Sequence, residues 1–231
     1  MLPVVILSGG LASRLKPISD SIPKSLIEIN KKPFLEWQLQ FLEKNGCKQV
    51  VLCVAHLSSS IENYIQSRPK SQIEINFSND GAKQLGTGGA IVKARKLLSS
   101  EFLVLYGDSY LPINFNEVSD FFLQSNKLGL MTVKKNDLGY EQSNVIFENG
   151  MVKAYRKNIP DPNMKFIDFG LNAFKSSVFD DLNADQYIDL STIQANLATR
   201  NELIGYEVHE NYYEVGSFSG IKDFENYTKG F

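Results

Sequence analysis

Residues 7–26, LSGGLASRLKPISDSIPKSL, join the end of a short apolar run to a loop that holds two glycines and several basic side chains. The apolar run is too short for a helix and is typical of a buried strand. Gly9 and Gly10 allow positive φ angles and expose backbone N–H groups to an anion. Arg14 and Lys24 supply positive charge that a triphosphate needs. The stretch predicts an anion site at a strand end, and a surface loop with solvated bases is the alternative.

Beyond this loop, strand-like runs alternate with segments of helical periodicity. We expect strands at residues 4–8, 49–55, 72–78 and 101–106, and helices at residues 33–45, 58–66 and 88–98, the second capped by its serines. The second half is richer in strands, expected at residues 128–134, 145–147, 152–155, 165–174 and 203–208, with helices at 189–199 and 219–229.

This alternation favours a mostly parallel sheet with helices on both faces. Ligands of such sheets bind at the carboxyl ends of the strands. The opening loop and Gly107-Asp108 both follow expected strands, so they should face one crevice. No linker, repeat or low-complexity segment divides the chain, and we expect one continuous domain over residues 1–231.

Composition narrows the range of partners and chemistries. A formal net charge of -2 does not indicate a nucleic-acid or membrane partner. Cys47 and Cys53 are expected to be buried reduced thiols, which indicates a cytoplasmic protein. With only His56 and His209, the chain has little from which to build a multi-histidine zinc site or histidine-centred acid–base catalysis.

A set of motifs along the chain resembles the sugar-1-phosphate nucleotidyltransferase family. The family opening runs roughly GGxGTRLxPxT…PKxL…KP, and it is matched here by Gly9-Gly10, Ser13-Arg14-Leu15, Pro17, Pro23-Lys24, Leu26 and Lys32-Pro33, with Ala12-Ser13 in place of Gly-Thr. LGTGGA at residues 85–90, Tyr106-Gly107-Asp108 and Tyr213-Glu214-Val215-Gly216 extend the match. The resemblance implies an α/β fold, a three-layer α/β/α Rossmann-like sandwich with a mixed, mostly parallel central sheet.

The resemblance also implies roles for particular residues. It implies catalytic roles for Arg14, Lys24 and Asp108, nucleotide binding by Leu7, Ser8, Gly9, Gly10, Gly86 and Thr87, sugar-phosphate binding by Asn144, Lys157 and Asp168, and Mg²⁺ binding by Asp108 and Glu214. A nucleotide-binding part would cover about residues 1–110 and a sugar-phosphate-binding part about 111–231. Taken alone, Asp108 could cap a loop, Lys157 could be a solvated surface lysine and Asp168 could bond to a neighbouring turn.

The implied reaction joins an NTP to a sugar 1-phosphate and releases pyrophosphate. The attacking phosphate monoester is largely dianionic at neutral pH, because its second pKa is about 6, so no general base is required. The obstacle is repulsion between anions, which positioned cations must overcome. An enzyme with two histidines can therefore perform this chemistry.

The substrate is less strongly indicated than the reaction. The chain looks most like the branch of heptose 1-phosphate guanylyltransferases and N-acetylmuramate 1-phosphate uridylyltransferases, and we favour GTP with D-glycero-D-manno-heptose 1-phosphate. Asp80 is a candidate nucleotide-binding residue, because a carboxylate can accept from guanine N1–H and from its 2-amino group. The alternative is that Asn79-Asp80-Gly81 is simply a turn.

Other functions stay open at this point. One is uridylyl or thymidylyl transfer to another sugar 1-phosphate, such as that of N-acetylmuramate or a hexose. A methylerythritol phosphate cytidylyltransferase lacks the LGTGGA segment, and a nucleotide-sugar glycosyltransferase would carry a DxD site where Asp108-Ser109-Tyr110 stands here. A catalytically silent relative is a third class. Family members are often dimers or tetramers, which leaves a homo-oligomer open.

Overall fold

The computed structural model describes residues 1–10, 15, 22–81, 83–137, 139, 141–157 and 159–230. Its large sheet contains β1 (Val4–Leu7), β4 (Gln49–Val54), β5 (Glu74–Asn79), β6 (Glu101–Tyr106), β8 (Gly129–Lys135), β9 (Val145–Glu148), β10 (Met151–Tyr155), β11 (Phe166–Lys175) and β12 (Leu203–Val208). Two small antiparallel pairs join β2 (Glu28–Ile29) to β3 (Lys32–Pro33) and β7 (Ser109–Tyr110) to β13 (Tyr213–Glu214).

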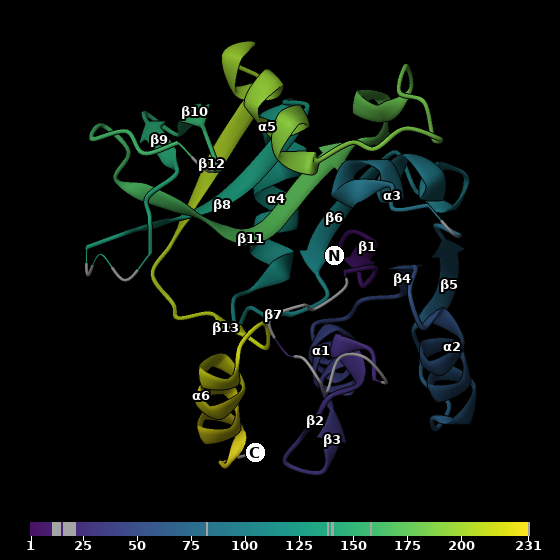
Figure 1. Ribbon diagram of the computed structural model, residues 1–231. Helices are drawn as coiled ribbons and strands as arrows, with labels where there is room; N and C mark the ends of the chain where they lie inside the picture. The colour runs from purple at the N-terminus through teal and green to yellow at the C-terminus, as the bar shows by residue number, and fades with distance from the viewer. Residues whose placement is uncertain are drawn as a thin grey trace.

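The helices are α1 (Phe34–Lys44), α2 (Ser58–Ser67), α3 (Gly86–Ala94), α4 (Phe115–Ser125), α5 (Leu190–Thr199) and α6 (Phe218–Thr228). Figure 1 shows them around the sheet, with α6 at the carboxyl-terminal end of the chain. None of the helices within the described ranges combines the length and the apolar character needed to cross a membrane.

The first half of the sheet is parallel, as the alternating pattern predicts. Strand β1 lies between β4 and β6, and β5 pairs with the outer edge of β4. Because all four strands run the same way, the segments that follow their carboxyl ends meet at one edge of the sheet. Gly9-Gly10, Asp80 and Gly107-Asp108 are therefore brought to the same edge.

The second half of the sheet is mainly antiparallel, which corrects the expectation of a mostly parallel sheet. β11 pairs antiparallel with β6, β8 and β9, and β10 pairs antiparallel with β9 and β12, whereas β12 and β8 are parallel. These pairings close β11, β8, β12, β10 and β9 into a ring. The tight turn at Asn149 and Gly150, both at positive φ, forces β9 and β10 to run in opposite directions.

Alternate side chains of the strands enter two different cores. Val4 and Ile6 pack in a core with α1, α2 and α4, whereas Val5 packs in a second core with α3 and α5. Successive side chains of a strand point to opposite faces, so a strand that is apolar throughout must be covered on both. The mixed sheet with helices on both faces is thereby confirmed.

Two helix starts differ from the sequence-based expectation. Helix α4 was not expected, although Asn114 caps it by accepting hydrogen bonds from the backbone N–H groups of Asn116 and Glu117. At α2 the expected serine cap is wrong. The residue before that helix, Leu57, adopts a left-handed conformation and no side chain caps the end, while Ser58 accepts a hydrogen bond from Asn79 instead.

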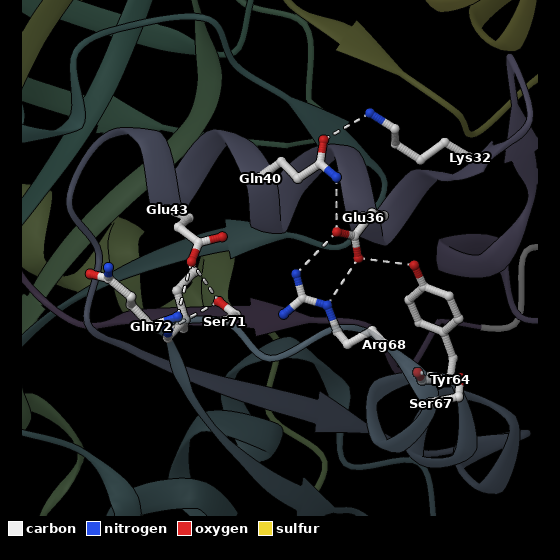
Figure 2. A network of polar contacts seen from close by, with 10 residues as sticks. Lys32, Glu36, Gln40, Glu43, Tyr64, Ser67, Arg68, Ser71 and Gln72 are labelled. Atoms are coloured by element: carbon white, nitrogen blue, oxygen red, sulfur yellow. Dashed lines mark hydrogen bonds and ion pairs between the residues drawn. The ribbon is translucent and has the colours of Figure 1, made fainter.

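A polar network centred on Glu36 fastens α1 to the end of α2 (Figure 2). The Glu36 carboxylate accepts hydrogen bonds from Arg68 Nε and Nη2, from the Tyr64 hydroxyl and from Gln40. Burial alone would raise the pKa of Glu36, but the bonds from Arg68 and Tyr64 outweigh it and hold that pKa below its ordinary value. Helix α1 also carries Gln38, whose amide donates to the carbonyls of Tyr106 and Ser109. The network therefore supports the turn that holds Asp108.

We expect Arg68→Met to lower the free energy of unfolding by about 3 kcal/mol, because it leaves the buried Glu36 carboxylate without its charge partner. The side chains of Arg68 and Glu36 are only 7% and 11% exposed. Urea denaturation measures the change. Arg156→Met is the matched control, since Arg156 is 50% exposed in its pair with Asp161 and should cost at most about 1 kcal/mol. Equal losses in the two variants would contradict a special role for the Glu36 network.

Candidate active site

A pocket of about 440 Å³ opens at the carboxyl ends of β1, β4, β5 and β6. This volume lies within the usual range for a small-molecule site, roughly 300–1,000 Å³. Its walls are formed by Leu7, Ser8, Gly9, Gly10, Lys24, Ser25, Cys53, Ala55, Asp80, Gln84, Leu85, Gly86, Thr87, Ala90, Tyr106, Gly107, Asp108, Lys157, Tyr187 and Asp189. The described ends of the opening loop, Gly9-Gly10 and Lys24-Ser25, do face one crevice with Gly107-Asp108.

Close backbone packing shapes the floor of the pocket. Ser8 N–H donates to the Cys53 carbonyl, which extends the β1–β4 pairing by one residue. A Cβ on Gly107 would lie 2.5 Å from Ser8 Oγ, and one on Gly9 would lie 3.2 Å from Ala55 Cβ. These glycines let three strand ends approach one another. Arg14, the predicted partner of the triphosphate, lies outside the described residues.

Lys24 and Asp108, which both line the pocket, form an ion pair. Lys24 Nζ lies 2.9 Å from Asp108 Oδ2, and the two side chains are 18% and 30% exposed. Lys24 belongs to a short 3₁₀ turn, Lys24–Leu26, and Asp108 follows β6, whose terminal carbonyl is held by Gln38. The pair brings a predicted cation and a predicted metal ligand together.

Glu214 approaches the same place from the carboxyl-terminal part of the chain. It pairs with Ser109 in the β7–β13 ladder, and Val215 N–H donates to the Asp108 carbonyl. A Cβ placed on Gly216 would lie 3.6 Å from Glu214 Oε1, 3.6 Å from Lys24 Nζ and 3.7 Å from Asp108 Oδ2, so both carboxylates lie near the Lys24 ammonium group. A side chain on Gly220 would collide with the Glu214 carbonyl, which shows how closely α6 packs behind this residue.

Two converging carboxylates suit Mg²⁺, which proteins commonly hold through one or two carboxylates together with substrate phosphates. Among the described residues, no group of three or more His, Cys, Asp or Glu side chains gathers to hold a metal alone. The chemistry of Asp108 and Glu214 therefore fits an ion that arrives with a phosphorylated substrate, provided that Lys24, now 2.9 Å from Asp108 Oδ2, turns to the phosphates.

Asp80 lies in the pocket wall at the end of β5, and its side chain does not form the turn that contains it. Asn79 makes that turn, because its side-chain oxygen accepts from Gly81 N–H. Asp80 Oδ1 is buried with no hydrogen-bond partner among the described residues, and Oδ2 lies 3.7 Å from a Cβ placed on Gly9. Burial raises the pKa of Asp80 to about 6, against the opposing charge of Lys93. Because Oδ1 has almost no accessible surface, Oδ2 is the carboxylate oxygen that a ligand in the pocket could contact.

The LGTGGA segment forms the start of α3 and packs against residues 186–190. Gly86 has φ +72°, and the Ile188 carbonyl accepts from Gly88 N–H and Gly89 N–H. A Cβ on Gly86 would lie 2.6 Å from Ile188 O. A Cβ on Gly88 would lie 2.9 Å from Ile188 Cγ2, and one on Gly89 would lie 2.9 Å from Gln186 O. All three glycines are therefore needed for contact with a neighbouring segment, which the motif alone did not reveal.

Lys157 lies in the pocket wall, but Asn144 and Asp168 do not line it. Asn144 Oδ1 accepts from Asp168 N–H, and Asp168 Oδ1 accepts from Gly170 N–H. Burial raises the pKa of Asp168 to about 6, while Gly170 N–H, Tyr155 and Lys157 act in the opposite direction. These two predicted residues thus form a strand-end network beside Lys157.

Asp189 is a pocket residue that the sequence-based reasoning missed. Its Oδ2 lies 3.9 Å from Lys157 Nζ, and its Oδ1 accepts from Ser191 N–H at the start of α5. The expected helix at residues 189–199 already identified Asp189 as its first residue, where aspartate is a preferred cap. No local sequence pattern indicates that Asp189 lies beside Lys157.

The nucleotidyl transferase family model matches residues 3–213. D-glycero-alpha-D-manno-heptose 1-phosphate guanylyltransferase of Campylobacter jejuni is 32% identical over 177 residues, which cover 77% of each chain. The catalytic subunit beta of mannose-1-phosphate guanylyltransferase from Drosophila melanogaster is 28% identical over 225 residues, and these cover 95% of this chain but 60% of that protein.

A solved structure shows the same fold. HddC from Yersinia pseudotuberculosis, complexed with GMP-PN, superposes with a TM-score of 0.83 at 23% identity. The superposition covers 99% of this chain and 100% of that one. The mixed α/β architecture, including its antiparallel second half, is therefore shared along the whole chain.

We expect Gly86→Ala to be more destabilising than Gly81→Ala by about 1–3 kcal/mol, the usual cost of forced overpacking. Both glycines have similar positive φ angles, +72° and +77°, so the strain of a left-handed alanine is matched. Only at Gly86 would the new methyl group meet a backbone atom, Ile188 O. Urea unfolding curves of the two variants give the difference, and equal midpoints would contradict the packing described here.

Proposed function

The chain belongs to the nucleotidyl transferase family and is a sugar-1-phosphate nucleotidyltransferase, and on this premise we propose that it transfers GMP from GTP to D-glycero-D-manno-heptose 1-phosphate. The products would be GDP-heptose and pyrophosphate. The 32% identity to the Campylobacter enzyme supports the choice of sugar, and both curated relatives described above are guanylyltransferases.

The Asp80 carboxylate, whose Oδ1 has no hydrogen-bond partner among the described residues, is the observation that supports guanine as the base. Guanine presents two adjacent donors, N1–H and the 2-amino group, which one carboxylate can accept together. Uracil and thymine present a single N3–H between two carbonyl oxygens, and those oxygens would repel the carboxylate. Asp80 lines the pocket, and no described residue donates to its Oδ1, so the carboxylate is not committed to a partner within the protein.

The described pocket walls carry too little positive charge to bind two phosphorylated substrates, so further cations are required. They contain two lysines, Lys24 and Lys157, against three aspartates, Asp80, Asp108 and Asp189. A triphosphate and a sugar phosphate add several negative charges. We propose that Arg14, in the opening loop, and Mg²⁺ supply the remaining compensation.

In the proposed mechanism, an oxygen of the sugar 1-phosphate attacks the α-phosphorus of GTP and pyrophosphate leaves. Lys24 would contact the α-phosphate and the incoming phosphate, Lys157 would hold the latter, and Arg14 would stabilise charge on the departing pyrophosphate. Asp108 and Glu214 would hold Mg²⁺, which supplies Lewis-acid polarisation of phosphate oxygens when bound. Because the nucleophile is already ionised, none of these residues removes a proton.

The remaining candidate-site residues have simpler proposed roles. Leu7, Ser8, Gly9, Gly10, Gly86 and Thr87 would line the base and ribose, and Asn144 and Asp168 would support the sugar-phosphate side beside Lys157. We propose a single domain of Rossmann-like three-layer type, with the nucleotide part at about residues 1–110 and the sugar-phosphate part at about 111–231. The two buried free thiols, Cys47 and Cys53, support a cytoplasmic location.

The reaction can be tested by combining each of the four NTPs with each member of a panel of sugar 1-phosphates and measuring the pyrophosphate released. We expect the highest kcat/KM for GTP with the manno-configured heptose 1-phosphate. A higher value for UTP or dTTP with N-acetylmuramate or hexose 1-phosphate would instead favour the uridylyl- or thymidylyltransferase alternative. Transfer of sugar from a nucleotide sugar, with no pyrophosphate from any pair, would favour a glycosyltransferase.

We expect kcat/KM for GTP to fall as the pH is lowered through about 6, because protonation of Asp80 removes an acceptor for guanine. Asp80→Asn should lower kcat/KM for GTP at neutral pH by about 10- to 100-fold, in keeping with ~1.5–3 kcal/mol for hydrogen bonds to a charged group. The variant should lose less kcat/KM on acidification than the parent protein, and the fall that remains reflects the sugar phosphate, whose second pKa is also about 6. An unchanged pH profile in Asp80→Asn would show that another group is responsible.

A further inference from the structure

Lys157 is a pocket cation with one close carboxylate partner among the described residues. It follows β10, and its side chain is 49% exposed, so water competes for the ammonium group. Asp189 Oδ2, at 3.9 Å, is the oxygen that holds it near the pocket. Asp168 also bears on Lys157 through its charge, although its Oδ1 accepts from Gly170 N–H.

Asp189 is itself fixed by the start of α5. It is the residue before the helix, and its Oδ1 accepts from Ser191 N–H at 2.9 Å. Burial alone would raise the pKa of Asp189, but Ser191 N–H, Lys157 and Thr87 outweigh it and hold that pKa below its ordinary value. One carboxylate oxygen thus anchors the side chain to the helix, and the other remains available for Lys157.

The LGTGGA segment holds the same residues from the other side. Thr87 Oγ1 accepts from Leu190 N–H at 2.9 Å and donates to Asp189 Oδ1 at 3.4 Å. Ile188 N–H donates to the Leu85 carbonyl, and its own carbonyl accepts from α3. The Thr87 hydroxyl is therefore engaged within the protein, in a contact that spans 102 residues of sequence between the two parts of the pocket.

We propose that Asp189 is a positioning residue for the sugar 1-phosphate: it holds Lys157 at the pocket and, through Thr87, fixes that lysine relative to the nucleotide-binding turn. This inference deepens the proposed function and rests on it. Asp189 does not touch the reacting atoms in this role. It keeps the Lys157 ammonium near the place where the sugar phosphate must bind, so that less side-chain freedom is lost on binding.

The expected size of the effect follows from the cost of ordering one lysine. Immobilising a flexible side chain at a binding site costs about 0.5–1.5 kcal/mol, which corresponds to roughly two- to tenfold in affinity. Without Asp189, the Lys157 side chain would lose its freedom only when the sugar phosphate binds, and the affinity for that substrate would fall. The nucleotide, on the other side of the pocket, would be affected much less.

The experiment measures KM for heptose 1-phosphate and for GTP in Asp189→Asn, Lys157→Met and the double variant. Asparagine can still accept from Ser191 N–H, so the helix start is preserved. We expect Asp189→Asn to raise KM for the sugar phosphate about two- to tenfold, with KM for GTP changed by less than about twofold. In the Lys157→Met background the same substitution should have no further effect, because coupled residues are not additive.

Glu202→Gln is the matched control. It removes the Lys127–Glu202 ion pair, whose length of 3.8 Å and exposures of 33% and 30% resemble those of Lys157–Asp189, away from the pocket walls. Both KM values should be unchanged in this variant. A sugar-phosphate KM that is unchanged or lowered in Asp189→Asn, or that rises equally with the GTP value, would overturn the inference.

A readout that needs no turnover separates this inference from the proposed function. Brief acetylation with an N-hydroxysuccinimide ester, followed by peptide mass spectrometry, reports how accessible the Lys157 amine is. We expect several-fold faster labelling of Lys157 in Asp189→Asn than in the parent protein or in Glu202→Gln. Unchanged labelling would overturn the contact itself. Faster labelling without turnover on any substrate pair would preserve the contact and refute the proposed reaction.

Discussion

The ion pair between Lys24 and Asp108 joins segments that are 84 residues apart and organises the site around them. Asp108 follows β6, and its backbone carbonyl accepts a hydrogen bond from Val215 N–H, next to Glu214. The Asp108 carboxylate pairs with Lys24 at the end of the opening loop. An unpaired carboxylate in a partly buried cleft is unfavourable, and so is an unpaired ammonium group. Each residue therefore makes the position of the other stable before any substrate is present.

Local sequence patterns were sufficient for the elements that form the crevice. β1, β4 and β6 are short runs of apolar residues, too short for helices and followed by polar or glycine-rich turns, and this pattern leaves few alternatives. Helix α4 was missed although Asn114 and Glu117 have capping spacing and Phe115, Val118 and Phe122 share one face. The ring in the second half had no comparable signal, because it depends on the distant pairing of Phe166 with Val145.

The site shows the same division between local and distant information. The sequence led to Lys24, Asp108 and Lys157 through motifs, and the pocket contains all three. It did not lead to Asp189 as a pocket residue, because the contact with Lys157 exists only after β10 and α5 have packed together. Asp80 is an intermediate case. The motif Asn79-Asp80-Gly81 is compatible with a turn or a ligand-binding carboxylate, and the structure assigns the turn to Asn79.

Gly220 has a consequence for how the scaffold can be altered. Since α6 packs too closely behind Glu214 for any side chain at Gly220, the helix and this acidic residue must move together. Phe224 of α6 packs against the rings of Phe34 and Trp37 in α1. Changing the size of those rings would shift the helix, and the Glu214 carboxylate would move with it. Substitutions in this aromatic cluster thus offer a way to move Glu214, the carboxylate that we propose for Mg²⁺, without altering any residue of the pocket wall.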